Sequence, residues 1–285
     1  MFTLVEIKTT NASSVPIFNW LRRRKSRKKE PLFVLTQKAS PSYFHLLVLF
    51  PPDASEQEQL RRIRAGLREA AEKNSTALVL PKSFPFPHLP REMGFPVCSP
   101  YPLLRRLSGQ ICTFAAEGMG ISPSRLRVAL IGRRLTPEMS EAAQRLTKRA
   151  RILYMYAGND TRAACHALRS ITGAAVGELG REQADIYVLF AVPDIIVPIH
   201  GRTLCLNFSG CAPIICGGIL ADGAVLAPPC RLFDNKEYDQ PSLLWALVLS
   251  GNIDLPDLDI KGICQGERLL ELRGLGIPAE PSVYA

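Results

Sequence analysis

The sequence contains no long apolar run and no signal-peptide pattern. Its longest apolar stretches, residues 44–50 and 213–220, are bounded or broken by Pro or Gly. A membrane-spanning helix needs roughly 18–20 apolar residues, so neither stretch is predicted to cross a bilayer. The N-terminal residues 1–8 lack the charged segment, the apolar segment and the small-residue cleavage site of an export signal, and they are more typical of a strand. We therefore expect a cytoplasmic protein.

Closely spaced cysteine pairs are also missing, although the chain has eight cysteines. Zinc and iron–sulfur sites usually contain a C-x2-C pair, because one tight turn then presents two thiolates to the same ion. Four cysteines lie closer together than the others, with the spacing C-x5-C-x4-C-x13-C, at Cys205, Cys211, Cys216 and Cys230. We interpret the cysteines as small apolar residues in a reducing compartment and expect no metal cofactor.

Several catalytic motifs are absent as well. The sequence has no P-loop, no H-E-x-x-H and no nucleophile elbow. Its four histidines lie far apart, at His45, His88, His166 and His200. No catalytic motif therefore indicates which reaction, if any, the protein catalyses.

What is present is the composition of an ordinary globular protein. The 285 residues are 47% hydrophobic and 21% charged, which excludes a disordered, collagen-like or coiled-coil chain. At about 100–200 residues per domain, this length predicts two domains. Seven of the 23 prolines fall between residues 81 and 102, where they exclude a regular helix or a central strand. We predict an N-terminal domain over residues 1–105, with a proline-rich connection from residue 81, and a second domain over residues 106–285.

Positive charge is concentrated in one place. The formal net charge is +9 at pH 7, but seven of the 35 basic residues form one run. Outside this run there are 28 basic and 26 acidic residues, so the excess of positive charge is local. It does not predict a protein that binds nucleic acid over its whole surface. The run consists of Arg22, Arg23, Arg24, Lys25, Arg27, Lys28 and Lys29.

The N-terminal domain is predicted to have a small α/β fold. Four short runs rich in aliphatic and aromatic residues are typical of strands, at residues 2–7, 32–36, 44–50 and 76–80. A helix is expected before the last of them, because Ser55 and Glu58 have capping-box spacing, in which hydroxyl and carboxylate each satisfy a free backbone N–H. Its apolar residues repeat at helical spacing, and three arginines are expected on other faces: Leu60, Ile63, Leu67 and Ala70 against Arg61, Arg62 and Arg68.

The second domain is predicted to be a doubly wound, Rossmann-like parallel sheet. Apolar runs alternate with amphipathic helices, as a parallel sheet covered on both faces requires, with strands at residues 127–131, 152–156, 174–176, 186–190 and 204–208. Thr136 and Pro137 begin the first helix, and Asp160 is predicted to cap the second, which Gly173 ends. A hairpin around Asp222-Gly223 is predicted over residues 219–226, followed by helices at 242–249 and 260–272.

Two loops of this sheet are candidates for ligand binding, because ligands bind beyond the carboxyl ends of such strands. The first loop keeps Gly132 but not the other two glycines of the dinucleotide fingerprint, and Arg133 and Arg134 follow it before Thr136. Their guanidinium groups would crowd a pyrophosphate held by backbone amides, or would hold phosphate or carboxylate oxygens directly. Two solvated arginines on a turn are the alternative.

The second loop begins with Gly158 and Asn159 and continues through Asp160 to Thr161 and Arg162. An acidic residue at the end of the second strand favours NAD, whereas an Arg nearby accommodates the 2′-phosphate of NADP. The strand ends without an acid and the Arg follows, so the pattern favours NADP. An N-cap beside a surface arginine is the alternative.

These segments resemble the shikimate dehydrogenase superfamily. Residues 159–163, Asn-Asp-Thr-Arg-Ala, are similar to that family's Asn-Arg-Thr segment after the second Rossmann strand, which grips NADP. Ala184-Asp185-Ile186, with Pro193 further on, is similar to its fourth-strand pattern. The likeness covers residues 125–208 and implies the two-domain architecture and a nucleotide site.

The chain departs from that family where its chemistry lies. The family's catalytic Lys stands two residues after a Pro at a strand end, whereas Lys82 directly follows Pro81, and the family's Asn-Thr-Asp motif is missing. The resemblance therefore does not carry over the reaction. Lys82 is a weak candidate for proton transfer, since lysines at strand ends are usually only exposed.

Two functions from different classes fit these patterns. The first is a Rossmann-like protein with a degenerate dinucleotide or anion site, either an NADP-dependent oxidoreductase or a non-catalytic nucleotide sensor. Its ligand would be bound by Gly132, Arg133, Arg134, Thr136, Gly158, Asn159, Thr161 and Arg162. The second is an adaptor that docks on an anionic surface, a membrane or a nucleic acid, through residues 22–29, which follow the apolar segment 15–21. A solvated loop is the alternative to that second function.

The first function makes a geometric prediction. Gly132, Gly158 and Ala191 should end the first, second and fourth strands at one edge of the sheet. The helix that begins after Thr136 should direct its free N–H groups to the same place, where they favour an anion.

Overall fold

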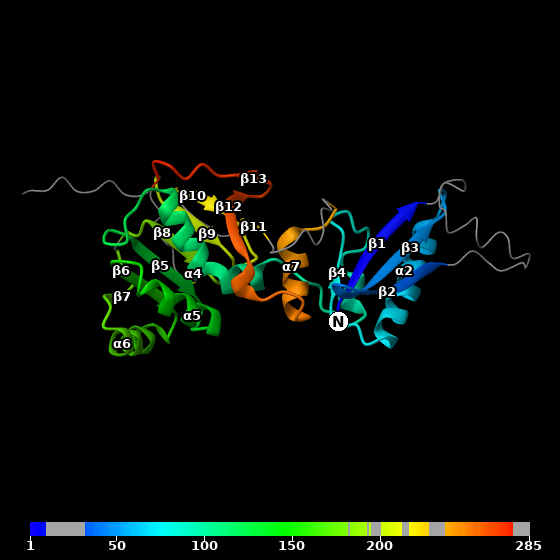
Figure 1. Ribbon diagram of the computed structural model, residues 1–285, viewed down its shortest axis with the longest axis horizontal. Coiled ribbons are helices and arrows are strands. Elements are labelled where there is room, and N and C mark those ends of the chain that lie inside the picture. The colour runs from blue at the N-terminus through cyan, green and yellow to red at the C-terminus, as the bar shows by residue number, and fades with distance from the viewer. Residues whose placement is uncertain are drawn as a thin grey trace, which may run out of the picture. The chain divides into compact units, whose positions relative to one another are not determined.

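The computed structural model (Figure 1) describes residues 1–9, 32–181, 183–192, 194, 201–212, 217–227 and 237–275. Contacts group the chain into two compact units. One unit contains Met1–Ser99 and Pro228–Asp257, and the other contains Pro100–Ala227 and Leu258–Ala285. The grouping differs from the predicted division after residue 105, because the segment 228–257 returns to the N-terminal unit.

The first unit is built on a four-stranded mixed sheet in the order β2-β3-β1-β4. Strand β1 is parallel to β3 and β4, and β2 is antiparallel to β3. The strands are β1 Thr3–Thr9, β2 Phe33–Ala39, β3 Ser42–Phe50 and β4 Leu78–Val79. All four strands predicted for this part of the chain are confirmed.

The helix α2, Glu56–Glu72, packs its apolar side on this sheet. Leu46 and Val48 of β3 meet Ile63 and Leu67 of α2, and all four side chains are fully buried. Burying each such side chain contributes roughly 1.5–3 kcal/mol, so this layer is the main source of stability of the unit. The helix α7, Gln240–Leu249, also belongs to this unit, and a helix was predicted there over residues 242–249.

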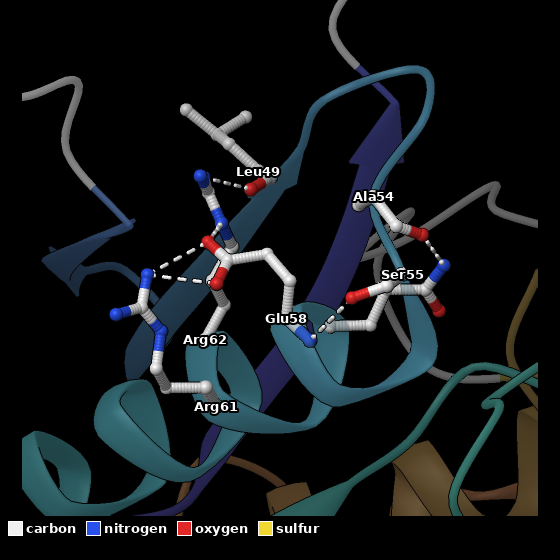
Figure 2. Close-up of polar contacts among 7 residues, drawn as sticks. Leu49, Ala54, Ser55, Glu58, Arg61 and Arg62 are labelled. Carbon is white, nitrogen blue, oxygen red and sulfur yellow. Dashed lines mark hydrogen bonds and ion pairs between the residues drawn. The ribbon is translucent and has the colours of Figure 1, made fainter.

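Two details of α2 differ from the prediction (Figure 2). Ser55 caps the helix by accepting from the N–H of Glu58 at 3.3 Å, but the Glu58 carboxylate accepts from Arg61 and Arg62 instead of closing the capping box. Arg62 also lies on the buried side, at 8% exposure, where it donates to the carbonyl oxygen of Leu49 at 2.8 Å. The bonds from the two guanidinium groups join opposite charges, and such charge-assisted bonds are stronger than one from a neutral backbone N–H.

The proline-rich segment runs mostly without regular structure, as predicted. It contains one helical turn, α3 Leu89–Glu92, with Pro at its start. Its chain is held to β4, because Cys98 donates its N–H to Leu78 O at 2.8 Å. The residues beyond it begin α4, Tyr101–Gly118, in the second unit.

The second unit contains a six-stranded parallel sheet in the order β10-β9-β8-β5-β6-β7. The chain moves outward from β5 to β7 and then, from β8 to β10, outward in the other direction. This is the strand order of the doubly wound Rossmann fold. The strands are β5 Arg127–Gly132, β6 Ile152–Ala157, β7 Val176–Glu178, β8 Ile186–Leu189, β9 Leu204–Asn207 and β10 Ile219–Ala221. The predicted fold class, a two-domain α/β chain with a Rossmann-like half, is confirmed.

Two helices connect the first three of these strands, α5 Pro137–Leu146 and α6 Thr161–Thr172. Thr136 caps α5 by accepting from the N–H of Met139 at 3.2 Å, and Gly173 ends α6 in the left-handed region, both as predicted. The helix α4 packs on α5 and β8. A second buried cluster includes Ile131, Tyr187 and Leu189, and its described members come from strands and loops.

Two predictions for the C-terminal part were wrong. Residues 219–226 do not form a hairpin, because β10 joins the parallel sheet beside β9 while β11, Gly223–Ala227, pairs with β12, Asp259–Gln265. Asp222 accepts from the N–H of Gly266 at 2.7 Å, which ties this point to the turn after β12 instead. Residues 260–272 do not form a helix: β12 turns at Gly266, with a φ of +56°, into β13, Arg268–Leu269. A short 3-10 turn at Leu255–Asp257 precedes β12.

Candidate functional site

Three loops of the second unit meet at one edge of the parallel sheet, as predicted. Gly132 at the end of β5 lies beside Ala157 at the end of β6, and Ile131 lies beside Leu189 at the end of β8. The strand order reverses between β5 and β8. In open α/β sheets this reversal is where ligands bind, because the loops diverge there and leave the strand ends accessible.

The loops after β5 and β6 are fastened to each other. Asp160 accepts from the N–H of Leu135 at 3.1 Å. Gly158 has a φ of +56°, and an added Cβ there would lie 2.4 Å from the carbonyl oxygen of Arg133. Asp160 was predicted to cap α6, but its side chain makes no capping bond, because its carboxylate is turned to the neighbouring loop.

Two predicted ligand-binding hydroxyls are used by the backbone. Thr161, which is 7% exposed, accepts from the N–H of Ala157 at 2.8 Å and donates to Gly158 O at 2.7 Å. The hydroxyl of Thr136 accepts from Met139 as the cap of α5. Both threonines therefore shape the loops, and the groups left to meet a ligand are the side chains around them.

Arg133 crosses the reversal point of the sheet. Its Nε donates to Val192 O at 3.0 Å, and the same nitrogen lies 3.5 Å from a carboxylate oxygen of Asp194. The side chains of Arg133 and Asp194 are 63% and 66% exposed, so the ion pair itself contributes little to stability. Sequence reasoning did not connect these two loops, although an Asp soon after a buried strand is a recognisable signal.

Arg134 and Asn159 are exposed on the two fastened loops, and Arg162 is exposed in the first turn of α6. No hydrogen bond or ion pair of the Arg134 or Arg162 side chain occurs among the residues that the structure describes. Both arginines stand near a helix start, Arg134 before α5 and Arg162 in the first turn of α6, where free N–H groups also favour an anion. This part of the edge therefore combines exposed arginines that make no ion pair in the described part of the chain with the N-termini of two helices.

The geometry of the first loop does not fit a pyrophosphate held by backbone amides. The chain folds over Gly132, so that a Cβ there would lie 3.2 Å from Arg134 O and 3.3 Å from the sulfur of Met139. The N–H of Leu135, which faces this loop, is already bonded to Asp160. The arginine side chains, in contrast, fit a phosphate group approached from solvent.

The other predicted residues lie elsewhere. Lys82 belongs to the first unit, where its side chain is exposed and its N–H donates to Glu237 O at 2.7 Å. Asp185 lies before β8, at the opposite edge of the sheet from the loops, and accepts from the N–H of Arg127 at 2.9 Å. The basic run at residues 22–29 lies outside the described residues.

The cysteines of the described part are free thiols, and most are shielded from water. Burial raises the pKa of Cys98 to about 11 and that of Cys205 to about 12. Cys112 and Cys165 are buried too, while Cys211 is exposed; Cys216 and Cys230 are not among the described residues. Over the described ranges, no group of three His, Cys, Asp or Glu side chains is placed to hold a metal ion.

No helix in the described part of the chain is both long and apolar enough to span a membrane. No protein-family model matches the sequence, and no curated protein matches it.

Solved structures give distant matches. Shikimate dehydrogenase in complex with NADP+ is 10% identical, with 73% of this chain and 76% of that chain covered and a TM-score of 0.27. Aspartate transcarbamoylase from Trypanosoma cruzi in complex with carbamoyl aspartate and phosphate is 12% identical, with 75% and 73% covered and a TM-score of 0.30. The probable ornithine cyclodeaminase from Bordetella pertussis Tohama I is 17% identical, but only 37% of this chain and 36% of that chain are covered, with a TM-score of 0.28. Scores this low assign neither family nor activity.

Proposed function

We propose that the second unit binds a phosphate-bearing nucleotide at the loops after β5 and β6, and that arginine side chains hold the phosphate. The observation that supports this most directly is the pair Arg134 and Arg162. Both are exposed near the edge of the parallel sheet where β5 and β6 end, and neither guanidinium has a partner in the described part of the chain. Arginine recognises phosphate through two parallel N–H donors, so each of these groups is suited to bind phosphate oxygens.

Side-chain binding replaces the backbone cradle of the usual dinucleotide site. Because Asp160 takes the N–H of Leu135 and the chain covers Gly132, the first loop offers little to a pyrophosphate. A terminal or 2′-phosphate that meets Arg162 needs no such cradle. NADP is therefore the candidate ligand among dinucleotides, with Arg162 as its 2′-phosphate contact.

The proposed role is binding rather than turnover, as in a nucleotide sensor. The only proton-transfer candidate, Lys82, is an exposed residue of the other unit, and the family to which the sequence is similar uses a different spacing and a further motif that is missing here. The alternative proposal is that the protein belongs to the shikimate dehydrogenase superfamily and catalyses an NADP-dependent oxidation. A turnover assay with NADPH and candidate carbonyl substrates tests it.

Thermal unfolding in the presence of ligands tests the binding proposal. NADPH and ATP should raise the melting temperature, NADH should do so less than NADPH because it lacks the 2′-phosphate, and S-adenosylmethionine, which has no phosphate, should not. The double change Arg134→Ala with Arg162→Ala should remove the shifts. A matched control is Lys148→Ala with Arg149→Ala, two exposed charges beyond the other end of α5. Absence of any shift at millimolar nucleotide, or shifts that survive the double change, would contradict the proposal.

A second candidate function rests on the basic run in the sequence. Seven positive charges directly after the apolar segment 15–21 suit attachment to an anionic membrane surface, at about 1 kcal/mol per basic residue near the leaflet. The same charges would bind nucleic acid through its phosphates. Sedimentation with anionic vesicles should fall when the seven residues are changed to Gln and when salt is raised. Equal sedimentation of both proteins would remove this candidate, and the same comparison with RNA tests the nucleic-acid form.

A further inference from the structure

The helix α2 of the first unit exposes a row of arginines on the side opposite its apolar face. Arg61, Arg64 and Arg68 follow one another at spacings of three and four residues, so they lie along one side of the helix, and all three are exposed. Arg62 is the exception, since it is buried against β3. It donates to Leu49 O and to the Glu58 carboxylate, which ties this side of the helix to β3 (Figure 2).

Two surface hollows adjoin this row, and Arg64 and Arg68 line both of them. The larger, about 480 Å³, lies between α2 and α3 and is lined on its apolar side by Leu89, Met93 and Phe95. The smaller, about 440 Å³, lies along α2 and includes Leu60 and Ala65. We call these lining residues together the α2 surface; they are Gln57, Leu60, Arg61, Arg64, Ala65, Arg68, Ala71, Leu89, Glu92, Met93 and Phe95.

The charge of the α2 surface is uncompensated mainly at its centre. Arg61 is held by Glu58, with a guanidinium nitrogen 2.7 Å from the carboxylate (Figure 2). Arg64 lies 3.8 Å from Glu92 in a pair whose side chains are 46% and 62% exposed, which neutralises little. Arg68 has no ion pair among the described residues. The two arginines that line both hollows are therefore those with the most charge left to offer.

We propose that the α2 surface is a docking site for an acidic peptide segment of a partner protein that also carries apolar side chains. Arg64 and Arg68 would pair with carboxylates of the peptide. The apolar residues Leu89, Met93 and Phe95 would contact an aliphatic or aromatic side chain in the larger hollow. Met and Arg are both enriched in protein–protein interfaces, and a rim of charge around an apolar floor is their usual anatomy. This inference concerns the first unit and does not depend on nucleotide binding by the second.

Other occupants fit less well. The chain's own basic run has the same sign as the arginines and would be repelled. A nucleic acid would find no stacking platform here, because Phe95, at 9% exposure, offers no face on which a base could stack. Arg64 and Arg68 line both hollows, so the two adjoin along α2, which suits an extended segment better than a compact small molecule.

The test begins with selection from a random peptide library on the full chain, with the seven residues of the basic run changed to Gln so that they do not attract acidic peptides. Selected peptides should combine Asp or Glu with apolar residues. Arg64→Glu with Arg68→Glu should weaken their binding at least about tenfold by fluorescence anisotropy, as expected for central interface arginines. The control, Lys148→Glu with Arg149→Glu, makes the same change of charge in the other unit and should leave binding unchanged.

A second variant separates docking from simple attraction of charge. Ala71 is exposed and lines the larger hollow, so Ala71→Lys adds both a positive charge and bulk. If the acidic peptide docks in the hollow, it should bind more weakly to the Ala71→Lys variant. If it is only attracted by the overall positive charge, it should bind more strongly to that variant. Three results would overturn the proposal. They are stronger peptide binding to Ala71→Lys than to the wild type, equal binding to the wild type and to the Arg64→Glu, Arg68→Glu variant, and failure to select any acidic peptide. Single-stranded RNA that binds and is released by the same double change would assign the surface to nucleic acid instead. If the double variant fails to fold, Ala71→Lys decides alone.

Discussion

Arg133 donates its Nε hydrogen to the carbonyl oxygen of Val192 at 3.0 Å, across the point where the strand order of the parallel sheet reverses. Its neighbour Arg134 has no side-chain partner in the described part of the chain. Two adjacent arginines of one loop therefore have different roles. Arg133 holds the loops after β5 and β8 together, and Arg134 is left to meet a ligand.

This difference predicts unequal effects of the two single changes on ligand binding. Arg134→Ala should weaken binding of ATP or NADPH by about tenfold or more, since a hydrogen bond to a charged group is worth about 1.5–3 kcal/mol. Arg133→Ala should weaken it less, because its guanidinium is already engaged. Arg134→Ala should shift the free energy of unfolding by no more than about 0.5 kcal/mol, as is usual for exposed loops, whereas Arg133→Ala should cost about 1 kcal/mol because it loses the bond to Val192 O. Isothermal titration calorimetry measures both affinities, and a larger loss for Arg133→Ala would refute the assignment.

The contact between Gly158 and Arg133 predicts a large cost for a single methyl group. Gly158→Ala must place an L-residue at a φ of +56° with its Cβ 2.4 Å from Arg133 O, so the two fastened loops have to separate. We expect a loss of about 2–4 kcal/mol in the free energy of unfolding, from the backbone strain and the clash together. Gly173→Ala is the matched control: its φ is +65°, but nothing lies within 4 Å of the added Cβ, so about 1 kcal/mol is expected. Equal costs in urea denaturation would show that the loops are not fastened here.

The fold was largely predictable from the sequence because its elements carry local signals. Capping residues such as Thr136, the Pro that follows it and the stop at Gly173 act within a few residues of the chain. The pattern failed where partners are distant in sequence. Asp222-Gly223 is typical of a hairpin turn, yet β11 pairs with β12. Residues 260–272 have apolar residues at helical spacing, yet this segment forms a strand that turns at Gly266.

The place of the two loops at the sheet edge was predictable, but their detailed contacts were not. The sequence located the loops after β5 and β6, because strand ends and glycines mark them. It did not show that Asp160 bonds to Leu135 rather than capping α6, nor that Arg62 turns into the core while Arg61 stays outside. Each of these choices depends on which group of a neighbouring segment lies within hydrogen-bond distance, and spacing along one segment contains no such information.

The contrast between Arg61 and Arg62 predicts different costs for the same substitution. Arg62→Met leaves the carbonyl oxygen of Leu49 without its donor at a buried position, and should cost about 2–3 kcal/mol in the free energy of unfolding. Arg61→Met removes a pair whose guanidinium side is 66% exposed, and should cost less than about 1 kcal/mol. Chemical denaturation of the two variants beside the wild type makes the comparison. Similar costs would indicate that Arg62 does not hold α2 on the sheet.

Glu6 of β1 predicts one component of the pH dependence of stability. Burial raises the pKa of Glu6, but the hydrogen bonds and charges of Lys8 and His45 outweigh it and hold the pKa below its ordinary value of 4.5. A carboxylate with a lowered folded-state pKa stabilises the protein above its unfolded pKa and loses that contribution as the pH falls through the folded one. Glu6→Gln should therefore be less stable than the wild type near neutral pH, and the difference should shrink as the pH falls below 4.5.

The control for this prediction is Glu72→Gln, at an exposed position of α2 without an ion pair in the described part of the chain. It should change stability little at either pH. Urea denaturation at neutral and at acid pH measures the difference in the free energy of unfolding between each of the two variants and the wild type. A Glu6→Gln difference that stays constant with pH would mean that Glu6 does not interact with Lys8 and His45 in its charged form.

Thiol labelling should separate the cysteines by their surroundings. The thiolate is the reactive species, so a thiol with a raised pKa and no access to water reacts slowly. Burial raises the pKa of Cys112 and raises that of Cys205 to about 12, whereas Cys211 is exposed. Under native conditions iodoacetamide should modify Cys211 early and leave Cys112 and Cys205 intact until denaturant is added, as followed by mass spectrometry of the digested protein. Early modification of Cys205 would mean that β9 is not an interior strand of the parallel sheet, because the neighbours β8 and β10 would then not be shielding it.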